Sequence, residues 1–345
     1  MKTASFLAFY LQLYVGFTFE VIWNVPSEKC SAASRFPILL ENFNIKHNTD
    51  QKFYGDEVVL LYSSRFGRYP YYENYDKTKP VNGGLPQKAN LTTHLEQAQK
   101  DIISAIPNET FDGIAVIDFE EWRPTFDTNW SLKRVYREQS IDDVKRRFPS
   151  MGQQELRMKA KEEFDMAAKN FMLESLWLGK KLRPMARWGF YGFPLCNYDA
   201  GANAGDECKN SFREHNNRLS FLFKSSDALF PSIYLTRENA FNRNYVRAVL
   251  KEAKRVAHQN EWSKQIYAYT KFEYHEYNIE TKFYTKDDLC NTIGVAKEQK
   301  LDGVLLWSTS EHMSKRCERI SDYVSMMLGP FIDACIVRNS AFCCQ

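Results

Sequence analysis

The feature that most constrains this 345-residue chain is the alternation of short apolar runs with longer segments of helical periodicity. The runs are rich in β-branched and aromatic residues, which is typical of strands. Seven such runs are present: Phe19–Trp23, Val58–Tyr62, Gly113–Phe119, Trp188–Phe193, Ala228–Leu235, Gln265–Thr270 and Gly303–Trp307. Between them, apolar residues recur at spacings of three and four, which predicts helices, for instance over Leu91–Ile106, Val144–Leu182, Tyr245–Ala257 and Leu289–Ala296.

This order of elements predicts an α/β fold with a parallel sheet covered by helices. Burial on both faces explains why the strands are nearly continuous apolar runs. A doubly wound sheet normally carries a Gly-rich turn after its first strand, but that position reads Asn24-Val25-Pro26-Ser27. We therefore expect a distorted (β/α) TIM-like barrel of about seven parallel strands with outer helices. With 44% hydrophobic residues and no Pro- or Ser-rich linker, the chain is expected to form one domain.

The N-terminus has the layout of a cleaved secretory signal. Lys2 precedes an apolar run over residues 6–15, which is followed by small residues near Gly16. We expect residues 1–18 to be a signal peptide and the mature protein to be secreted and extracellular. No later run reaches the roughly 18 apolar residues of a membrane span. Three sequons predict glycosylation at Asn90, Asn108 and Asn129.

The cysteines and the charge narrow the class of protein further. Eight cysteines without a CxxC pair, and without histidines at ligand spacing, indicate disulfides in an oxidising compartment and no zinc site. A formal net charge of +3 falls short of the basic stripe of a nucleic-acid binder. It is compatible with a polyanionic substrate in a local basic groove. We expect no metal, no cofactor and no nucleic-acid partner.

Polar and aromatic side chains close several of the predicted strands. In a β/α barrel the active site lies at the C-terminal ends of the strands. Tyrosines and a tryptophan around two acids are suited to a sugar, because ring faces take its C–H faces and hydroxyls take its polar edges. These strand-end residues are Tyr62, Asp118, Glu120, Tyr191, Tyr234 and Trp307.

The sharpest local signal is the acidic pair in Ile117-Asp118-Phe119-Glu120-Glu121. Side chains two apart on a strand point the same way, so Asp118 and Glu120 share a face. Repulsion between two carboxyls in a closed cleft raises at least one pKa, which suits a general acid for a glycosidic oxygen. The alternative is a pair of barrel-mouth carboxylates bound to Arg123 or a nearby lysine. These residues alone leave both interpretations open.

The neighbours of this pair have simpler interpretations. Glu121 is expected on the other strand face, in solvent or paired with an arginine outside the cleft. Trp122 and Trp130 are expected to be packing residues. Trp307, which precedes Ser308, fits either packing or a sugar platform.

The residues resemble those of a known family, the animal hyaluronidases, which include insect, arachnid and other venom enzymes. The similar stretches follow one another through nearly the whole mature chain. They are Trp23-Asn24-Val25-Pro26 with Cys30, Leu61-Tyr62-Ser63-Ser64, Gly83-Gly84-Leu85-Pro86-Gln87, Asp118–Pro124, Trp188–Pro194 with Cys196, Pro231-Ser232-Ile233-Tyr234, Gly303–Trp307 and Leu328-Gly329-Pro330.

The resemblance implies an endo-glycosidase that cleaves hyaluronan at the β-1,4 bond following N-acetylglucosamine, with weaker action on chondroitin. Glu120 matches the family's proton donor and Asp118 the acid that steers the substrate acetamido group, whose oxygen attacks the anomeric carbon with retention of configuration. Tyr191 and Tyr234 would line the site of the cleaved sugar. The remaining expected substrate contacts are Tyr62, Arg123, Trp307 and Ser308.

The resemblance also implies the disulfides Cys30–Cys317 and Cys196–Cys208, a catalytic barrel over residues 19–335 and a monomer. Residues 336–345 would be a short cysteine-containing tail, the remnant of an EGF-like module. Cys290 and Cys335 have no counterpart, so a bond between them and two buried thiols both stay open.

Two departures from the family pattern stand out: Glu121 replaces a small residue, and Asn197 replaces a tyrosine that often follows the matching cysteine. The alternative to an active enzyme is a weak or inactive hyaluronan-binding paralogue of the same fold. Retention of Glu120 favours the enzyme, because a binding protein does not need the acid.

Overall fold

The computed structural model describes residues 19–31, 34–202, 204–259, 263–274, 280–338 and 344, so the predicted signal peptide lies outside the described residues. Every one of the seven predicted runs contains a strand. These strands are β1 (Glu20–Asn24), β3 (Val58–Tyr62), β6 (Ile114–Asp118), β7 (Arg187–Phe190), β8 (Ala228–Leu229), β9 (Gln265–Thr270) and β10 (Gly303–Trp307). All of their ladders are parallel, which confirms the predicted α/β barrel architecture.

The strands form two arcs in the orders β2-β1-β10-β9-β8 and β3-β6-β7. The arcs join on one side through a parallel bridge between Tyr191 and Phe230. Gly189 permits this approach, since a Cβ there would meet the Ala228 carbonyl. On the other side, the buried Asn48 follows β2 (Lys46–His47), and its amide bonds the Val58 N–H and C=O, at 2.9 and 2.8 Å. One side chain thus supplies the hydrogen bonds of a missing ladder.

Residues alternate between the barrel interior and the helix-facing layer. In β6, Ile114 and Val116 belong to the inner cluster, whereas Ala115 and Ile117 pack in the outer core. The inner cluster ends in a ring of partly buried aromatic side chains, which includes Tyr62, Tyr191, Tyr234 and Trp307. The barrel is therefore a packed core with an aromatic mouth.

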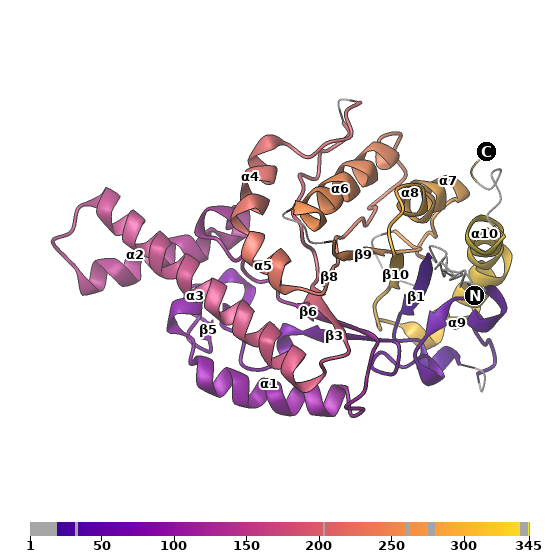
Figure 1. Ribbon diagram of the computed structural model, residues 1–345, viewed down its shortest axis with the longest axis horizontal. Coiled ribbons are helices and arrows are strands. Elements are labelled where there is room, and N and C mark those ends of the chain that lie inside the picture. The colour runs from indigo at the N-terminus through magenta and orange to yellow at the C-terminus, as the bar shows by residue number, and fades with distance from the viewer. Residues whose placement is uncertain are drawn as a thin grey trace, which may run out of the picture.

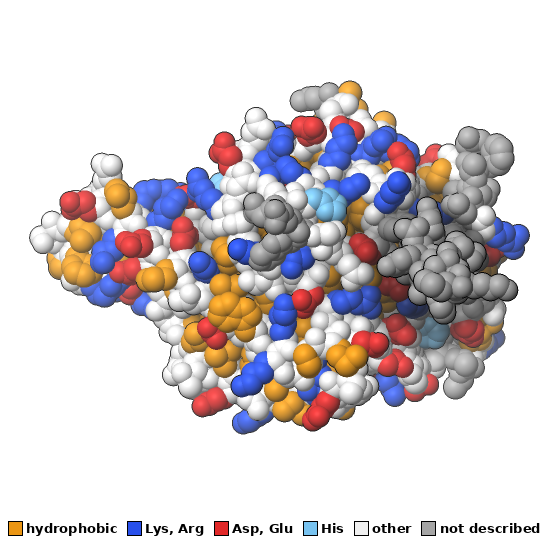
Figure 2. Space-filling view, viewed as in Figure 1, with side chains coloured by type: hydrophobic (Ala, Val, Ile, Leu, Met, Phe, Trp, Pro, Cys, Tyr) orange, Lys and Arg blue, Asp and Glu red, His pale blue; other side chains and the backbone are white. Residues whose placement is uncertain are grey.

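The helices surround the strands (Figure 1). They are α1 (Leu91–Ala105), α2 (Arg134–Arg147), α3 (Gln153–Leu182), α4 (Asn210–Arg218), α5 (Ser220–Ser225), α6 (Asn242–Ala257), α7 (Lys286–Leu289), α8 (Val295–Glu298), α9 (Met313–Tyr323) and α10 (Gly329–Ile332), with π-helical turns at 290–294, 324–328 and 333–337. The helix α2 and the start of α3 project away from the barrel. Figure 2 shows that acidic and basic side chains are interspersed over the face of the molecule seen in this view. No helix of the described segments is long and apolar enough to cross a bilayer.

Two element predictions need correction. The single helix expected over 144–182 is broken, because α2 ends at Arg147 and α3 begins at Gln153. Pro149 accounts for the break, since it disfavours helical backbone in the preceding residue, and Glu155 bonds back to the Gly152 N–H to start α3. The strand expected over 228–235 shortens to Ala228–Leu229, because Pro231 has no N–H for a ladder.

Short elements connect the barrel at its mouth. The antiparallel pair β4 (Tyr71–Tyr72) and β5 (Pro80–Val81) forms a hairpin, which encloses the 3-10 turn η5 (Glu73–Tyr75). A second 3-10 turn, η8 (Ser131–Lys133), leads into α2. None of these elements was predicted from the sequence.

Disulfides join Cys30 to Cys317 and Cys196 to Cys208, the pairs that the resemblance implied. A third joins Cys290 to Cys344, and Cys335 is also disulfide-bonded. Both options held open for Cys290 and Cys335 are therefore wrong: they neither bond each other nor remain thiols. Cysteine spacing alone does not determine connectivity, and the Cys290 bond fastens the end of the tail to the barrel.

Candidate active site

The acidic pair lies at the C-terminal end of β6. Asp118 is the last residue of the strand, in register with Tyr62 of β3, and is 5% exposed. Glu120 has the same parity as the inward-facing Val116, and its side chain is accessible from the mouth. The structure thus brings the two acids together at the place where barrel enzymes carry out their chemistry.

Electrostatics favours the retention of a proton by this pair. Burial, followed by repulsion from Glu120, raises the pKa of Asp118 well above its ordinary value. Burial also raises the pKa of Glu120, because the surrounding mouth displaces bulk water although the side chain is accessible. Lys133 opposes this rise most strongly among the neighbouring charges. At least one of the two carboxyls therefore holds its proton at pH values where an exposed acid has lost it.

The structure excludes a simple ion pair for these acids. Within the described part of the chain, neither Asp118 nor Glu120 lies within 4.0 Å of a cationic nitrogen, and Asp118 Oδ1 has no hydrogen-bond partner. Arg123 instead donates to the Thr128 carbonyl at 3.0 Å and stacks on Trp130, with its guanidinium carbon 4.4 Å from the ring centroid. The alternative interpretation, in which the two carboxylates are ion-paired with Arg123 or a nearby lysine, is therefore wrong.

An aromatic wall faces the acids. The Tyr191 hydroxyl donates to Ser232 Oγ at 3.2 Å, and the Tyr191 and Tyr234 rings lie 6.0 Å apart. Tyr234 stacks on Trp307, with centroids 5.9 Å apart, and the Trp307 indole N–H donates to the Tyr62 hydroxyl at 2.9 Å. These contacts fix four strand-end side chains in one surface, as a sugar-binding cleft requires.

A hollow of about 320 Å³ adjoins the wall, lined by Glu120, Arg123, Lys133, Tyr191 and Tyr198 among others. Tyr198 is 84% exposed, so its ring is open to a ligand. Trp122 also borders the hollow but is buried and bonds the Pro70 carbonyl, which confirms it as a packing residue.

Ser308 is not part of this surface. It is buried, and its hydroxyl donates to the carboxylate of Glu273. Glu273 also pairs with the buried Arg316, whose guanidinium contacts Ser308 Oγ at 3.0 Å. The expected substrate contact is therefore replaced by a buried network that supports the loop after Trp307, and we do not propose Ser308 as a binding residue.

Sequence reasoning missed two cations at the mouth. Lys271 follows β9 directly, and its Nζ lies 4.4 Å from the Tyr234 ring centroid and 5.3 Å from that of Trp307. The strand-end rule could have found it. Lys133 belongs to η8, far from any strand end, and no sequence signal marked it. Burial lowers the pKa of each to about 8.

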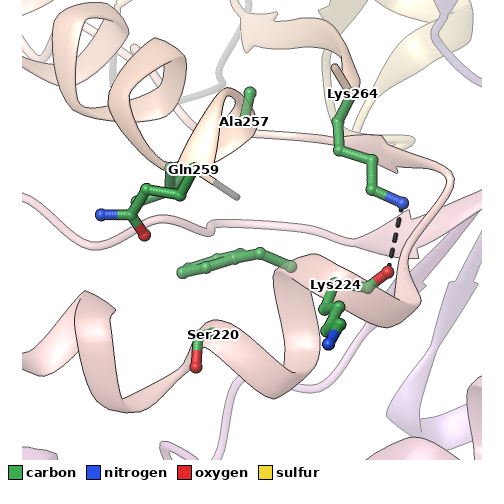
Figure 3. A pocket seen from close by; sticks show the side chains of 7 residues that line it. Ser220, Lys224, Ala257, Gln259 and Lys264 are labelled. Carbon is green, nitrogen blue, oxygen red and sulfur yellow. Dashed lines mark hydrogen bonds between the residues drawn. The ribbon is translucent and has the colours of Figure 1, made fainter. Parts of the chain in front are cut away.

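A second hollow lies at the opposite end of the barrel (Figure 3). Lys224 and Lys264 precede β8 and β9 respectively, and the Lys264 ammonium donates to the Lys224 carbonyl at 3.1 Å. Among the described residues, its lining includes no carboxylic acid.

The three sequons differ in accessibility. Asn90 and Asn108 are exposed. Asn129 is fully buried, and its amide nitrogen donates to the Arg123 and Thr125 carbonyls at 3.0 and 2.9 Å. A glycan would need that nitrogen, so Asn129 serves instead to hold the loop that carries Arg123.

Among the described residues, no cluster of three or more His, Cys, Asp or Glu side chains could hold a metal ion. The candidate site therefore consists of two carboxyls, an aromatic wall and flanking cations. A β/α barrel with paired acids at a strand end and an aromatic cleft has the architecture of a glycoside hydrolase.

Comparison with known proteins identifies the family. A family model described as Hyaluronidase matches residues 11–345. The chain is 38% identical over 318 residues to a Caenorhabditis elegans chondroitin hydrolase (91% of this chain, 69% of that protein). It is 34% identical over 319 residues to a Vespa magnifica hyaluronidase (90% and 88%). The chain belongs to the hyaluronidase family of glycoside hydrolases.

A solved structure agrees with this assignment. The crystal structure of bee venom hyaluronidase in complex with a hyaluronic acid tetramer matches with a TM-score of 0.84 at 32% identity, over 92% of this chain and 99% of that chain. The likeness extends over the whole barrel.

Proposed function

We propose that this protein is an endo-β-N-acetylhexosaminidase that hydrolyses the β-1,4 bonds between N-acetylglucosamine and glucuronate in hyaluronan. The observation that carries the proposal is the coupled pair of Asp118 and Glu120 at the end of β6, inside an aromatic mouth and in a chain of the hyaluronidase family. Glu120 is the acid and base, because it opens to the cleft while burial raises its pKa.

Asp118 acts on the substrate rather than on the leaving group. Its carboxyl lies deeper than that of Glu120 and on the same strand face, so it does not reach the opposite side of the sugar ring. A substrate acetamido group could place its N–H against Asp118 and its oxygen beneath the anomeric carbon. Such substrate-assisted hydrolysis dispenses with a carboxylate nucleophile, and Tyr234 would orient the acetamido carbonyl.

The substrate class is supported by the relatives and by the charge of the site. The relatives include a chondroitin hydrolase and hyaluronidases, and both polymers alternate an N-acetylhexosamine with a uronate. We propose hyaluronan as the main substrate and chondroitin as the weaker one. Arg123 and Lys271 flank the acid with positive charge, which suits a polyanionic chain.

We further propose that the protein is secreted as a monomer after removal of residues 1–18 and is glycosylated at Asn90 and Asn108. The disulfides fit an oxidising compartment. Mass analysis of the protein from a secreting host would show the mature N-terminus and the two glycans.

Zymography tests the activity. Purified protein run in a gel containing hyaluronan should clear the polymer, and a parallel gel with chondroitin should clear more weakly. Retention of hyaluronan without clearing would instead identify a binding protein of the same fold. Product sizing across pH completes the test, since an endo-acting enzyme releases intermediate oligosaccharides before small ones.

A further inference from the structure

The side chain of Lys133 lies at the barrel mouth and is bound to the main chain that carries the acid. Its ammonium donates to the main-chain carbonyls of Glu120 and Glu121, the latter at 3.0 Å. It also donates to the Tyr75 hydroxyl at 3.1 Å and lies 5.3 Å from the centroid of that ring. One cation thus links three separate segments: the end of β6, η5 and η8.

We propose that Lys133 is a positioning residue for the acid: its ammonium fixes the main chain that carries Glu120 and keeps a positive charge beside the Glu120 carboxyl. The proposal rests on the proposed function, since it assigns a role in the protonation and orientation of Glu120.

The hydrogen bonds of the Lys133 ammonium indicate that this residue positions the acid and does not bind the substrate. A lysine ammonium has three donors, and Lys133 has three acceptors in the protein. All of its donors are therefore engaged before a substrate arrives. Arg123 differs, because its guanidinium carries five donors and uses its Nη1 on the Thr128 carbonyl.

The backbone of the two loops next to Lys133 has a constrained geometry. Tyr75, an acceptor of the ammonium, has a φ of 58°, and Ser131, at the start of η8, has a φ of 55°. Side chains other than glycine rarely adopt this left-handed region, and such residues persist where the surroundings over-determine them. Lys133 bonds one of these loops and belongs to the other, so it is a contact that holds both.

The charge of Lys133 also acts on the acid. Among the charged groups near Glu120, Lys133 lowers its pKa most, and Glu121 opposes it. The other titratable groups that face Glu120 come from the C-terminal ends of β3, β6, β7 and β9, the segments that follow them, and η5. They are Asp118, Arg123, Tyr191, Tyr62, Tyr75 and Lys271. Removal of Lys133 therefore leaves Glu120 protonated to a higher pH, whereas removal of Glu121 does the opposite.

The test compares Lys133→Met with Lys133→Arg in the full chain. We expect Lys133→Met to lower kcat on hyaluronan by roughly 10- to 100-fold, the cost of a misplaced group, while KM changes less than about threefold. The alkaline limb of the pH profile of kcat/KM should shift to higher pH by about 0.5–1 pH unit. Lys133→Arg, which keeps the charge and the donors, should retain the position of the limb and most of kcat.

Three further variants make the result specific. Arg134→Met removes the charge of the neighbouring exposed arginine, whose Nε donates to the Ser131 carbonyl. This variant should leave kcat and the alkaline limb of the pH profile unchanged. Glu121→Gln should move the alkaline limb down, opposite to Lys133→Met. If Lys133→Met does not fold, Lys133→Gln keeps a neutral donor, and its limb should still move up.

Several outcomes would overturn the role of Lys133. They are an unmoved limb in both neutral variants at Lys133, a rise in KM alone, or an equal loss in the Lys133→Met and Arg134→Met variants. The proposed function fails separately, since it predicts that the unaltered protein cleaves hyaluronan and that Glu120→Gln does not.

Discussion

Asp118 and Glu120 project from the same face of one strand end, and in the described part of the chain neither is paired with a cation. Burial, followed by repulsion from Glu120, raises the pKa of Asp118, so the pair retains a proton that separate, exposed carboxyls would lose. The retained proton suits the site to acid catalysis, whereas two neighbouring buried carboxyls lower the stability of the fold once they ionise.

The first prediction separates the acid from its neighbour. Glu120→Gln should reduce kcat/KM on hyaluronan by on the order of 10²–10⁴, because the amide keeps the volume but has no proton to transfer. Glu121→Gln, one residue further on and of the opposite parity, should cost less than about tenfold at the pH of maximal activity. Steady-state kinetics on both variants is the measurement. Equal losses would mean that the parity assignment of the two residues is wrong.

The second prediction concerns the cost of Asp118. Its pKa is raised in the folded state, so the folded protein binds more protons than the unfolded chain at pH values above the ordinary aspartate pKa. Stability from this group is therefore present at acid pH and is lost as pH rises. Asp118→Asn should raise the melting temperature at pH 7, but not at pH 3.5, while activity falls. Differential scanning calorimetry at both pH values checks this, and a lower melting temperature at pH 7 would contradict it.

The third prediction concerns His94, whose effect on stability has the opposite pH dependence to that of Asp118. This side chain is fully buried, accepts the Arg68 N–H on Nδ1 at 2.9 Å and bonds Ser175 Oγ through Nε2. Burial lowers its pKa to about 4. The folded protein therefore binds fewer protons than the unfolded chain between pH 4 and 6.5, and stability increases with pH across this window.

The full effect of His94 on the free energy of unfolding is about 3 kcal/mol. Urea unfolding of the protein and of His94→Asn at pH 4, 5, 6 and 7 measures it. The variant should be less stable at pH 7, and the difference should shrink toward pH 4. A difference that stays constant with pH would show that His94 does not change its protonation between the two states.

The fourth prediction compares two disulfides of very different span. The Cys30–Cys317 bond closes a loop with a sequence separation of 287, whereas Cys196–Cys208 closes one of 12. In the chain-entropy model, removing the disulfide of the long loop costs about 6 kcal/mol and removing that of the short loop about 3 kcal/mol. Paired Cys→Ser variants and denaturant unfolding give the two values. A larger loss for the short loop would point to a role of that disulfide in shaping the folded cleft.

The barrel and much of its mouth could be predicted from the sequence because they depend on local patterns. An apolar run predicts a strand, and the residue that closes it lies at the barrel mouth, as Tyr62 and Trp307 do. The same rule failed for Ser308, because the partner that buries it, Glu273, is 35 residues away in the sequence. Which polar residue faces a cleft and which joins a buried network depends on such distant contacts.

Other features depend on loops whose conformation has no periodic signature. Lys133 reaches the acid only because η8 turns back toward β6, and Asn129 resembles a surface sequon although its amide is buried in the same loop. Likewise, the bond between Cys290 and Cys344 joins a helix of the barrel to the tail. In each case the tertiary structure, and not the residue type, decides the role.

The last prediction concerns the chemistry itself. A retaining glycosidase with two carboxyls places its nucleophile about 5–5.5 Å from the acid, and an inverting one leaves roughly 6.5–9.5 Å for a water, in both cases across the sugar ring. Asp118 ends β6 and Glu120 follows it by two residues with the same parity, so Asp118 approaches from the side of the acid. The acetamido oxygen of the substrate is then the group that can reach the anomeric carbon from beneath, while Asp118 stabilises the charge that develops on its nitrogen.

Two measurements test this mechanism. Because attack by the acetamido group and later attack by water each invert the anomeric carbon, the first product should have the β configuration, which NMR during hyaluronan cleavage can detect. Partly N-deacetylated hyaluronan should resist cleavage at the deacetylated sugars, since they lack the attacking oxygen. First appearance of the α anomer, or undiminished cleavage at deacetylated positions, would exclude the acetamido group as nucleophile even if Glu120 proved essential.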